Sequence, residues 1–374
     1  VEHWTMKIAY YMPFKPLGHP NPSGDLMIGS SLYTFLDQRG HGIQLISRLR
    51  TRWFYWKPWL WLRFLFEAVN ALHQLRRIRP DLWLTYHSYY KAPDVLGAMC
   101  TCIRPTPYFI FQGVYATKRK RQWKTRMGFL LNRWALCRAT AVFTNKRNDE
   151  INLRRLLPDS RVHYIAPGID TGAFQPDPAA RRKLREQWRC GREPVILAAA
   201  MFRPGVKTDG LVRVINACQL LKQKGRSFYL VICGEGATGA YLRKLAKHSL
   251  GNRAIFTGQV ARHAMKSIYS AADFFAFPGI QEGLGMVYLE AQACGLPVVA
   301  YDRWGAAEVV INGTTGLLCS PDEPRSFELA LDRLIVEGEL RRRMGAAARS
   351  HIDTHHDQHL NYRQFEQRLK QLVE

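Results

Sequence analysis

Residues 281–297 read QEGLGMVYLEAQACGLP and carry two glutamates, Glu282 and Glu290, eight positions apart. Gly283 and Gly285 allow a ligand to approach the backbone closely. The helix expected after them would present unpaired N–H groups and a positive dipole end to a diphosphate. Because a carboxylate accepts hydrogen bonds from a vicinal diol, a ribose or another sugar is a natural partner for the two glutamates.

Short apolar runs alternate with helical patterns on both sides of this stretch. The alternation predicts an α/β protein with parallel sheets. In the second half, strands are expected at 195–199, 229–233, 254–257, 273–277 and 297–300, with helices between them. In the first half, strands are expected at 6–12, 41–46, 81–86, 108–111 and 141–144, and helices at 26–38 and 62–78.

The chain length of 374 residues suits two domains of ordinary size. Proline and glycine are dense at 166–176, where the periodic pattern stops, so a linker is expected there. We therefore predict an N-terminal domain over 1–168 and a C-terminal domain over 169–355. A polar amphipathic helix over 356–374 is expected to pack back on the first domain.

A G-x-G-x-x-G motif at 234–239 suggests a dinucleotide site. That interpretation also requires an acidic residue about 20 positions further on to hold the ribose. No Asp or Glu occurs between Gly236 and Asp273. A tight strand-to-helix turn is the preferred interpretation.

The spacing of Glu282 and Glu290 resembles the E-x7-E signature of family 4 of the retaining glycosyltransferases, the group 1 glycosyl transferases. Segments at 305–308 and 312–318, the linker and the 234–236 turn are similar to that family as well. The resemblance implies a GT-B fold, in which two Rossmann-like parallel-sheet domains face a cleft. It also implies that the C-terminal domain binds the donor.

The resemblance gives several residues a role. Glu290 would bind the ribose hydroxyls, Glu282 would act as a catalytic residue on the transferred sugar, and Arg203 and Lys207 would hold the leaving diphosphate. Thr208 replaces the glycine that the family has after the lysine. The backbone of the following five residues would bind the sugar and diphosphate: Gly283, Leu284, Gly285, Met286 and Val287. Gly258 and Val260 belong to a loop that would pack against the base.

The N-terminal half departs further from the family. Gly24, within Pro22-Ser23-Gly24, is the match for the glycine that approaches the phosphate. Gln112-Gly113 stands where a catalytic His-Gly often occurs, which leaves His87 as the catalytic candidate near the acceptor. A histidine at a strand end can equally be a hydrogen-bonded structural residue.

The implied activity is transfer of a hexose-type sugar, with retention, from a nucleotide diphosphate sugar to a glycan or lipid-linked acceptor. The implied context is cell-envelope, exopolysaccharide or lipopolysaccharide synthesis. We expect no metal and no cofactor besides the donor, since the sequence has no Asp-x-Asp pair. The alternatives are a nucleotide-sugar epimerase or hydrolase of the same fold, and a basic nucleic-acid-binding protein, although no nucleic-acid motif is present.

The net charge is +24, and residues 1–168 alone contribute +17 from 26 basic and nine acidic side chains. Residues 50–66 and 117–138 interleave aromatic with basic side chains. Such stretches are either buried elements with a solvated basic face, or a surface for an anionic membrane. The sequence has no apolar run long enough to span a bilayer. We therefore expect the protein in the cytoplasm or on the inner face of the cytoplasmic membrane.

Overall fold

A computed structural model describes residues 5–20 and 24–373 and divides the chain into two compact units. Unit 1 comprises residues 1–166 and 359–374, and unit 2 comprises residues 167–358. The division falls two residues before the boundary that the linker composition suggested at 168, and unit 2 extends three residues past the expected end at 355.

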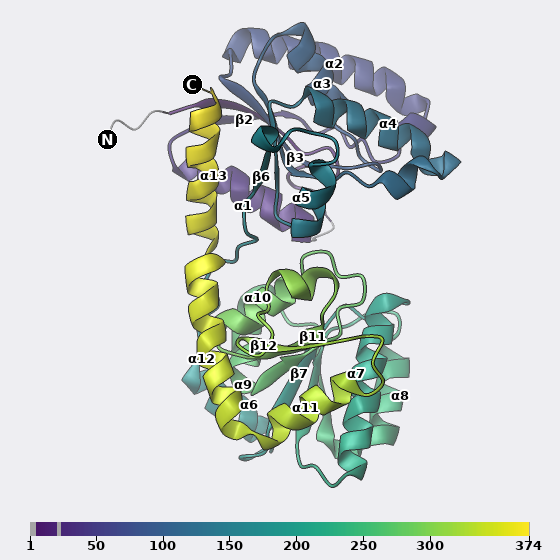
Figure 1. The fold of residues 1–374 in the computed structure, drawn as a ribbon, viewed down its shortest axis with the longest axis vertical. Helices are drawn as coiled ribbons and strands as arrows, with labels where there is room; N and C mark the ends of the chain where they lie inside the picture. Colours follow the sequence, from purple (N-terminus) through teal and green to yellow (C-terminus); the bar gives the residue numbers. More distant parts are fainter. Residues whose placement is uncertain (1–4, 21–23, 374) are drawn as a thin grey trace. The chain divides into compact units, whose positions relative to one another are not determined.

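Unit 1 is built on a parallel sheet with the strand order β2-β1-β3-β4-β5-β6 (Figure 1). Five of its strands lie at or within two residues of the predicted runs, because each is a short apolar segment between polar loops. The three-residue β6, sequence VHY, was not predicted. The strands are β1 (Lys7–Tyr11), β2 (Gly42–Ser47), β3 (Leu82–Ser88), β4 (Tyr108–Gly113), β5 (Ala141–Thr144) and β6 (Val162–Tyr164).

Helices cover both faces of this sheet. The side chains of α2, α3 and α4 form one core with the inward side chains of the strands, among them Ala68, Leu96 and Leu136. The helices of unit 1 are α1 (Gly24–Gln38), α2 (Trp59–Ile78), α3 (Val95–Ile103), α4 (Trp123–Arg138), α5 (Arg147–Leu153) and α13 (Gln358–Val373), with short 3-10 turns at Phe54–Trp56 and Thr117–Lys120.

The C-terminal helix α13 is an integral part of unit 1. The fully buried ring of Phe365 packs edge-on against Phe111 at 4.9 Å and Phe143 at 4.7 Å between ring centroids. The Arg39 guanidinium donates to the Glu366 carboxylate at 3.0 Å. The helix begins at Gln358, two residues later than expected, because the preceding helix runs to His355.

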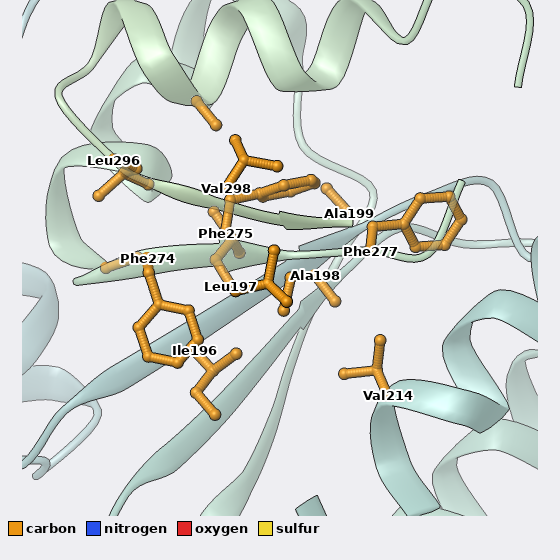
Figure 2. Close-up of a cluster of buried hydrophobic side chains, with 14 of the residues drawn as sticks. Ile196, Leu197, Ala198, Ala199, Val214, Phe274, Phe275, Phe277, Leu296 and Val298 are labelled. Atoms are coloured by element: carbon orange, nitrogen blue, oxygen red, sulfur yellow. The ribbon is translucent and has the colours of Figure 1, made fainter. Parts of the chain in front are cut away.

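Unit 2 contains a second parallel sheet, with the strand order β12-β11-β10-β7-β8-β9. Figure 2 shows part of its core, where Leu197 of β7, Phe275 of β10 and Val298 of β11 lie in one apolar cluster. The strands are β7 (Val195–Ala199), β8 (Tyr229–Cys233), β9 (Ala254–Gly258), β10 (Phe274–Ala276), β11 (Val298–Tyr301) and the unpredicted β12 (Gly316–Cys319).

The helices of unit 2 alternate with its strands, as a parallel sheet requires. They are α6 (Pro178–Gln187), α7 (Val206–Gln223), α8 (Gly239–Leu250), α9 (Met265–Ala271), α10 (Met286–Ala293), α11 (Ser326–Val336) and α12 (Gly338–His355). In the part of the chain that the structure describes, no helix is both long and apolar enough to cross a membrane.

Each sheet has one point where the direction of winding reverses. In unit 1 the chain leaves β1 toward β2 and returns to β3 on the other side of β1. In unit 2 it proceeds from β7 to β8 and β9 and returns to β10 on the other side of β7. Ligands of open α/β sheets bind at the carboxyl ends of the strands beside such a reversal. The loops after β1, β3, β7 and β10 are therefore the places to look for a site.

Candidate functional site

Lys207 and Glu282 meet at the reversal point of unit 2. Lys207 lies in the first turn of α7, after β7, and Glu282 lies in the loop that joins β10 to α10. The Lys207 Nζ and the Glu282 Oε2 form an ion pair, and the ammonium also lies 5.4 Å from the centroid of the Phe277 ring. Both side chains remain partly exposed, so a ligand can reach both charges.

The loop that carries Glu282 has a tightly specified backbone. Gly279, Gln281 and Gly285 all have positive φ angles, of 71°, 55° and 64°. The Gly305 N–H donates to the Glu282 carbonyl at 3.1 Å, which fastens this loop to the segment after β11. These contacts fix where the first turn of α10 begins.

The residues predicted to bind through their backbone occupy the loop and the start of that helix. Gly283 is exposed, Leu284 and Gly285 are buried, and Met286 and Val287 are half-buried in the first turn of α10. The first N–H groups of a helix have no partner within the helix. This end of α10 can therefore donate to an anion.

Gly285 cannot carry a side chain without strain, and we expect Gly285→Ala to lower the melting temperature more than Gly313→Ala. Both glycines have positive φ, which costs an alanine about 1–2 kcal/mol. A Cβ on Gly285 would lie 2.4 Å from Tyr288 Cδ2, whereas a Cβ on Gly313 would meet nothing within 4 Å. Thermal denaturation of the two variants measures the difference, and equal melting temperatures would contradict the crowding at Gly285.

Glu290 is buried on α10, with its two carboxylate oxygens held by different partners. The Tyr269 hydroxyl donates to Oε2 at 2.9 Å, and the Arg262 guanidinium lies 3.2 Å from Oε1. Burial raises the pKa of Glu290, while the charge of Arg262 and the hydrogen bond from Tyr269 oppose that rise. The sequence did not single out Arg262 or Tyr269, and the only signal was that Arg262 closely follows Val260 in the predicted base-binding loop.

The structure explains why Thr208 can stand where the family has a glycine, and it shows the position of Arg203. Arg203 is exposed, and its guanidinium donates to the Met201 sulfur at 2.7 Å. The Thr208 hydroxyl bonds the Arg203 carbonyl at 2.6 Å and the Thr238 hydroxyl at 2.7 Å. Thr208 therefore joins the loop after β7 to the turn after β8, and Arg203 extends into solvent from that loop.

The glycine-rich turn after β8 packs directly on a neighbouring backbone. A Cβ on Gly234 would lie 1.9 Å from the Ala200 carbonyl oxygen, and the Gly234 N–H donates to the Gly258 carbonyl at 3.0 Å. This packing accounts for the glycine without a dinucleotide. Gly258, with φ 72°, ends β9, and the half-buried Val260 follows it. The loops after β10, β7, β8 and β9 therefore line consecutive positions of one sheet edge.

His87 and Asp25 meet at the reversal point of unit 1. His87, the penultimate residue of β3, has a strained φ of 64°, and its Nδ1 lies 3.1 Å from Asp25 Oδ1 in the first turn of α1. Burial alone would raise the pKa of Asp25, but the charge and hydrogen bond of His87, together with the charges of Lys146 and Lys15, lower it. Asp25 was not predicted from the sequence. Gly24 begins α1 and is exposed, whereas Pro22 and Ser23 lie outside the described residues.

Gln112, at the position of the family's histidine, is a second strained residue at this edge. Its φ is 63°, it is buried, and its Oε1 accepts a hydrogen bond from the Tyr86 hydroxyl at 2.6 Å. Non-glycine residues in this conformation persist only where the surroundings impose it, and they are common at binding sites. The strain at His87 and Gln112 marks this edge as a candidate binding site, and the contact with Asp25 gives His87 a structural partner.

Two six-stranded parallel sheets with polar side chains at their reversal points define the class, which is that of proteins with a GT-B fold. The Anabaena protein HepE in complex with UDP has this fold, with a TM-score of 0.76 at 20% identity over 98% of this chain and 100% of that one. Sucrose-phosphate synthase from Thermosynechococcus elongatus matches with a TM-score of 0.74 at 18% identity, over 98% of this chain and 99% of that one.

Residues 181–351 match the family model of glycosyl transferases group 1, and this part of the chain belongs to that family. The chain is 35% identical over 204 residues to the GDP-mannose-dependent alpha-(1-6)-phosphatidylinositol monomannoside mannosyltransferase of Mycobacterium tuberculosis, covering 52% of each protein. It is 31% identical over 220 residues to the alpha-D-kanosaminyltransferase of Streptomyces kanamyceticus, covering 58% of this chain and 56% of that one. The chain spans about half the length of these curated relatives.

Proposed function

We propose that this protein is a retaining glycosyltransferase that moves a hexose from a nucleotide diphosphate sugar to a glycan or lipid-linked acceptor in cell-envelope or extracellular polysaccharide synthesis. The observation that carries the proposal is the ion pair between Lys207, in the first turn of α7, and Glu282, in the loop before α10, with Glu290 further along α10, beside the reversal point of unit 2. A cation, a helix N-terminus and two carboxylates are the groups that recognise a diphosphate joined to two polyols.

Each group has a distinct role in this proposal. The Lys207 ammonium neutralises charge on the departing diphosphate, together with the first N–H groups of α10. Glu282 accepts hydrogen bonds from the hydroxyls of the transferred sugar, and Glu290 accepts them from the ribose. In the structure Lys207 pairs with Glu282, so donor binding would exchange one ion pair for two sets of ligand contacts.

Stabilisation by Lys207 and α10 would leave no need for a metal ion. Retention would follow if the acceptor hydroxyl attacks the face from which the diphosphate leaves. His87 and Asp25 are the groups proposed to lie at the acceptor, where His87 could take up the proton of that hydroxyl.

The names of relatives support a nucleotide-sugar donor. The Mycobacterium tuberculosis relative is described as GDP-mannose-dependent and as acting on phosphatidylinositol monomannoside. HepE was solved with UDP-glucose as well as with UDP. A hexose donor and a lipid-linked acceptor are consistent with these descriptions.

A surface of unit 1 supports contact with an anionic membrane. Trp59 of α2 is 69% exposed and Trp123 of α4 is 70% exposed, so large apolar side chains on both helices lie outside the core. The Trp56 indole N–H donates to the Lys124 carbonyl at 3.0 Å and links the two segments. We call the following exposed side chains the α2–α4 surface: Trp56, Trp59, Trp61, Leu62, Leu65, Phe66, Val69, Trp123, Met127, Leu130 and Trp134.

The aromatic stretches are partly buried and partly exposed, and the exposed part supports the proposed membrane contact. Phe54, Tyr55 and Phe64 are buried in the core, whereas the α2–α4 surface is exposed and flanked by the basic Lys124, Arg126 and others. Tryptophan side chains favour the membrane interface, and lysine and arginine bind anionic headgroups.

Replacing two exposed side chains of this surface, in Leu62→Ser with Phe66→Ser, should weaken binding to phosphatidylglycerol vesicles at least about tenfold. The matched control is Leu329→Ser with Val336→Ser, since these side chains are 58% and 56% exposed on α11. Vesicle sedimentation at low salt measures the binding. Wild-type protein that stays in the supernatant, or a control variant that weakens as much, would rule out the α2–α4 surface as the membrane contact.

The proposed activity is tested by following nucleoside diphosphate release from GDP- and UDP-hexoses, with and without lipid or glycan acceptors and with EDTA. We expect release to depend on an acceptor, to continue in EDTA and to give a product of the donor's anomeric configuration by NMR. Release at the same rate without an acceptor would indicate a hydrolase, and loss of activity in EDTA or an inverted product would contradict the mechanism.

A further inference from the structure

A strongly cationic pocket lies at the carboxyl end of β2, in unit 1. It has a volume of about 320 Å³ and is formed by the segment after β2 and by the approach to α2 and its first turns. Five of its eight lining residues are basic, and the other three are apolar or aromatic. The lining residues are Arg48, Leu49, Arg50, Arg52, Trp53, Lys57, Leu60 and Arg63.

The charge of this pocket is not balanced by the protein around it. Among the residues that the structure describes, none of the five cations forms an ion pair with an acidic side chain. The one carboxylate on α2, Glu67, accepts a hydrogen bond from Ser47 at 2.6 Å. Burial and then the neighbouring charge of Arg52 lower the pKa of Arg50. Cations held this close without a counter-charge favour the entry of an anion.

The architecture around the pocket keeps these cations together. The Arg50 Nε–H donates to the Phe14 carbonyl at 3.0 Å, and the Arg52 guanidinium lies 6.0 Å from the centre of the Phe14 ring. Trp53 has a left-handed φ of 58°, and its N–H donates to the Lys91 carbonyl at 2.7 Å. These contacts therefore position Arg50 and Arg52, while Arg48 and Arg63 line the pocket as exposed side chains.

The neighbouring surface indicates what carries the anion. Leu60 and Arg63 line the pocket, and Trp59, Trp61 and Leu62 of the exposed α2–α4 surface lie between and beside them on the same turns of α2. A ligand with an anionic head and an apolar tail would contact both regions. Arginine side chains in particular suit a phosphate, because their paired N–H groups match its oxygens.

We infer that this pocket binds the phosphate group of a lipid, and that it holds the head of the phosphorylated lipid acceptor. Only the identification of this lipid as the acceptor rests on the proposed glycosyltransferase function. The pocket, its charge and the adjoining apolar surface support lipid phosphate binding by themselves.

The test uses the full chain and phosphatidylcholine vesicles that contain either phosphatidic acid or oleate at matched surface charge. Wild-type protein should bind the phosphatidic acid vesicles at least tenfold more tightly. Arg48→Gln with Arg63→Gln should remove this preference, since both arginines are exposed and their loss should leave the fold intact. Arg76→Gln with Arg77→Gln, which removes the same charge from exposed positions at the other end of α2, should retain it.

Equal binding of the two kinds of vesicle, or equal weakening by the two double variants, would overturn the pocket as a phosphate site. Glycerol 3-phosphate should compete only at concentrations far above those of the lipid. Competition at equal concentration would overturn the assignment to a lipid. Lys207→Met separates the proposals, since it should strongly slow sugar transfer and keep the vesicle preference. A vesicle preference without any transfer by the wild type would refute only the proposed function.

Discussion

Replacing Lys207 by methionine should lower the rate of sugar transfer by about two to three orders of magnitude, the usual effect of removing a group that stabilises developing charge. Methionine keeps most of the apolar stem of lysine, while the ammonium and its contact with the Phe277 ring are lost. Steady-state assay of nucleoside diphosphate release at saturating donor and acceptor measures the effect.

The fold should tolerate this change. Lys207 is partly exposed, and exposed ion pairs contribute little to stability, typically 0–1 kcal/mol. Lys244→Met is the matched control, because Lys244 is exposed on α8 and its variant should retain wild-type activity. Activity of Lys207→Met within a factor of about three of the wild type would mean that this ammonium has no part in the departure of the diphosphate.

Glu290→Gln should weaken binding of the nucleotide donor by about 10- to 100-fold, which corresponds to the loss of about 1.5–3 kcal/mol from hydrogen bonds to a charged acceptor. Glutamine keeps the shape of the side chain and can still accept from Tyr269, so the buried environment is retained. Calorimetric titration with GDP and UDP measures the affinity. Unchanged affinity for both would show that Glu290 does not bind the ribose.

The same substitution has a predicted pH dependence of stability. Because the pKa of Glu290 is raised in the folded protein, its stabilising contribution is complete below the pKa of the unfolded chain. That contribution is lost as pH rises through the folded pKa. Glu290→Gln should therefore melt at or above the wild-type temperature at pH 7, and its relative advantage should disappear near pH 4. A markedly lower melting temperature at pH 7 would indicate that the pair with Arg262 outweighs the burial of the charge.

The strands could be predicted because their signal is local. β7 and β8 coincide with the predicted runs, since each is a fully or mostly buried apolar segment bounded by polar or glycine-rich loops. α3 was not predicted because its sequence VLGAMCTCI is apolar without a helical period. β6 was missed because three residues carry too little pattern.

The same distinction between local and non-local signals applies to the site residues. Glu282, Glu290 and Lys207 could be proposed from the sequence through the E-x7-E spacing and the resemblance to the family, and the structure brings Lys207 and Glu282 into contact. The pairs Glu290–Arg262 and His87–Asp25 depend on which loops the sheet order makes neighbours. No local pattern records that order, and the same is true of the cationic pocket, where residues after β2 and at the start of α2 come together.

The location of the donor site is tested most directly by hydrogen exchange of the full protein with and without a nucleotide diphosphate sugar. Bound donor should protect backbone amides at 203–210, 258–262 and 282–290, which lie at or after the ends of neighbouring strands of unit 2. Under the same conditions the amides of α11 and α12, which follow the motif in the chain, should exchange at the same rate with and without donor. Saturating donor that leaves residues 282–290 unprotected, or protects only segments elsewhere, would contradict the account.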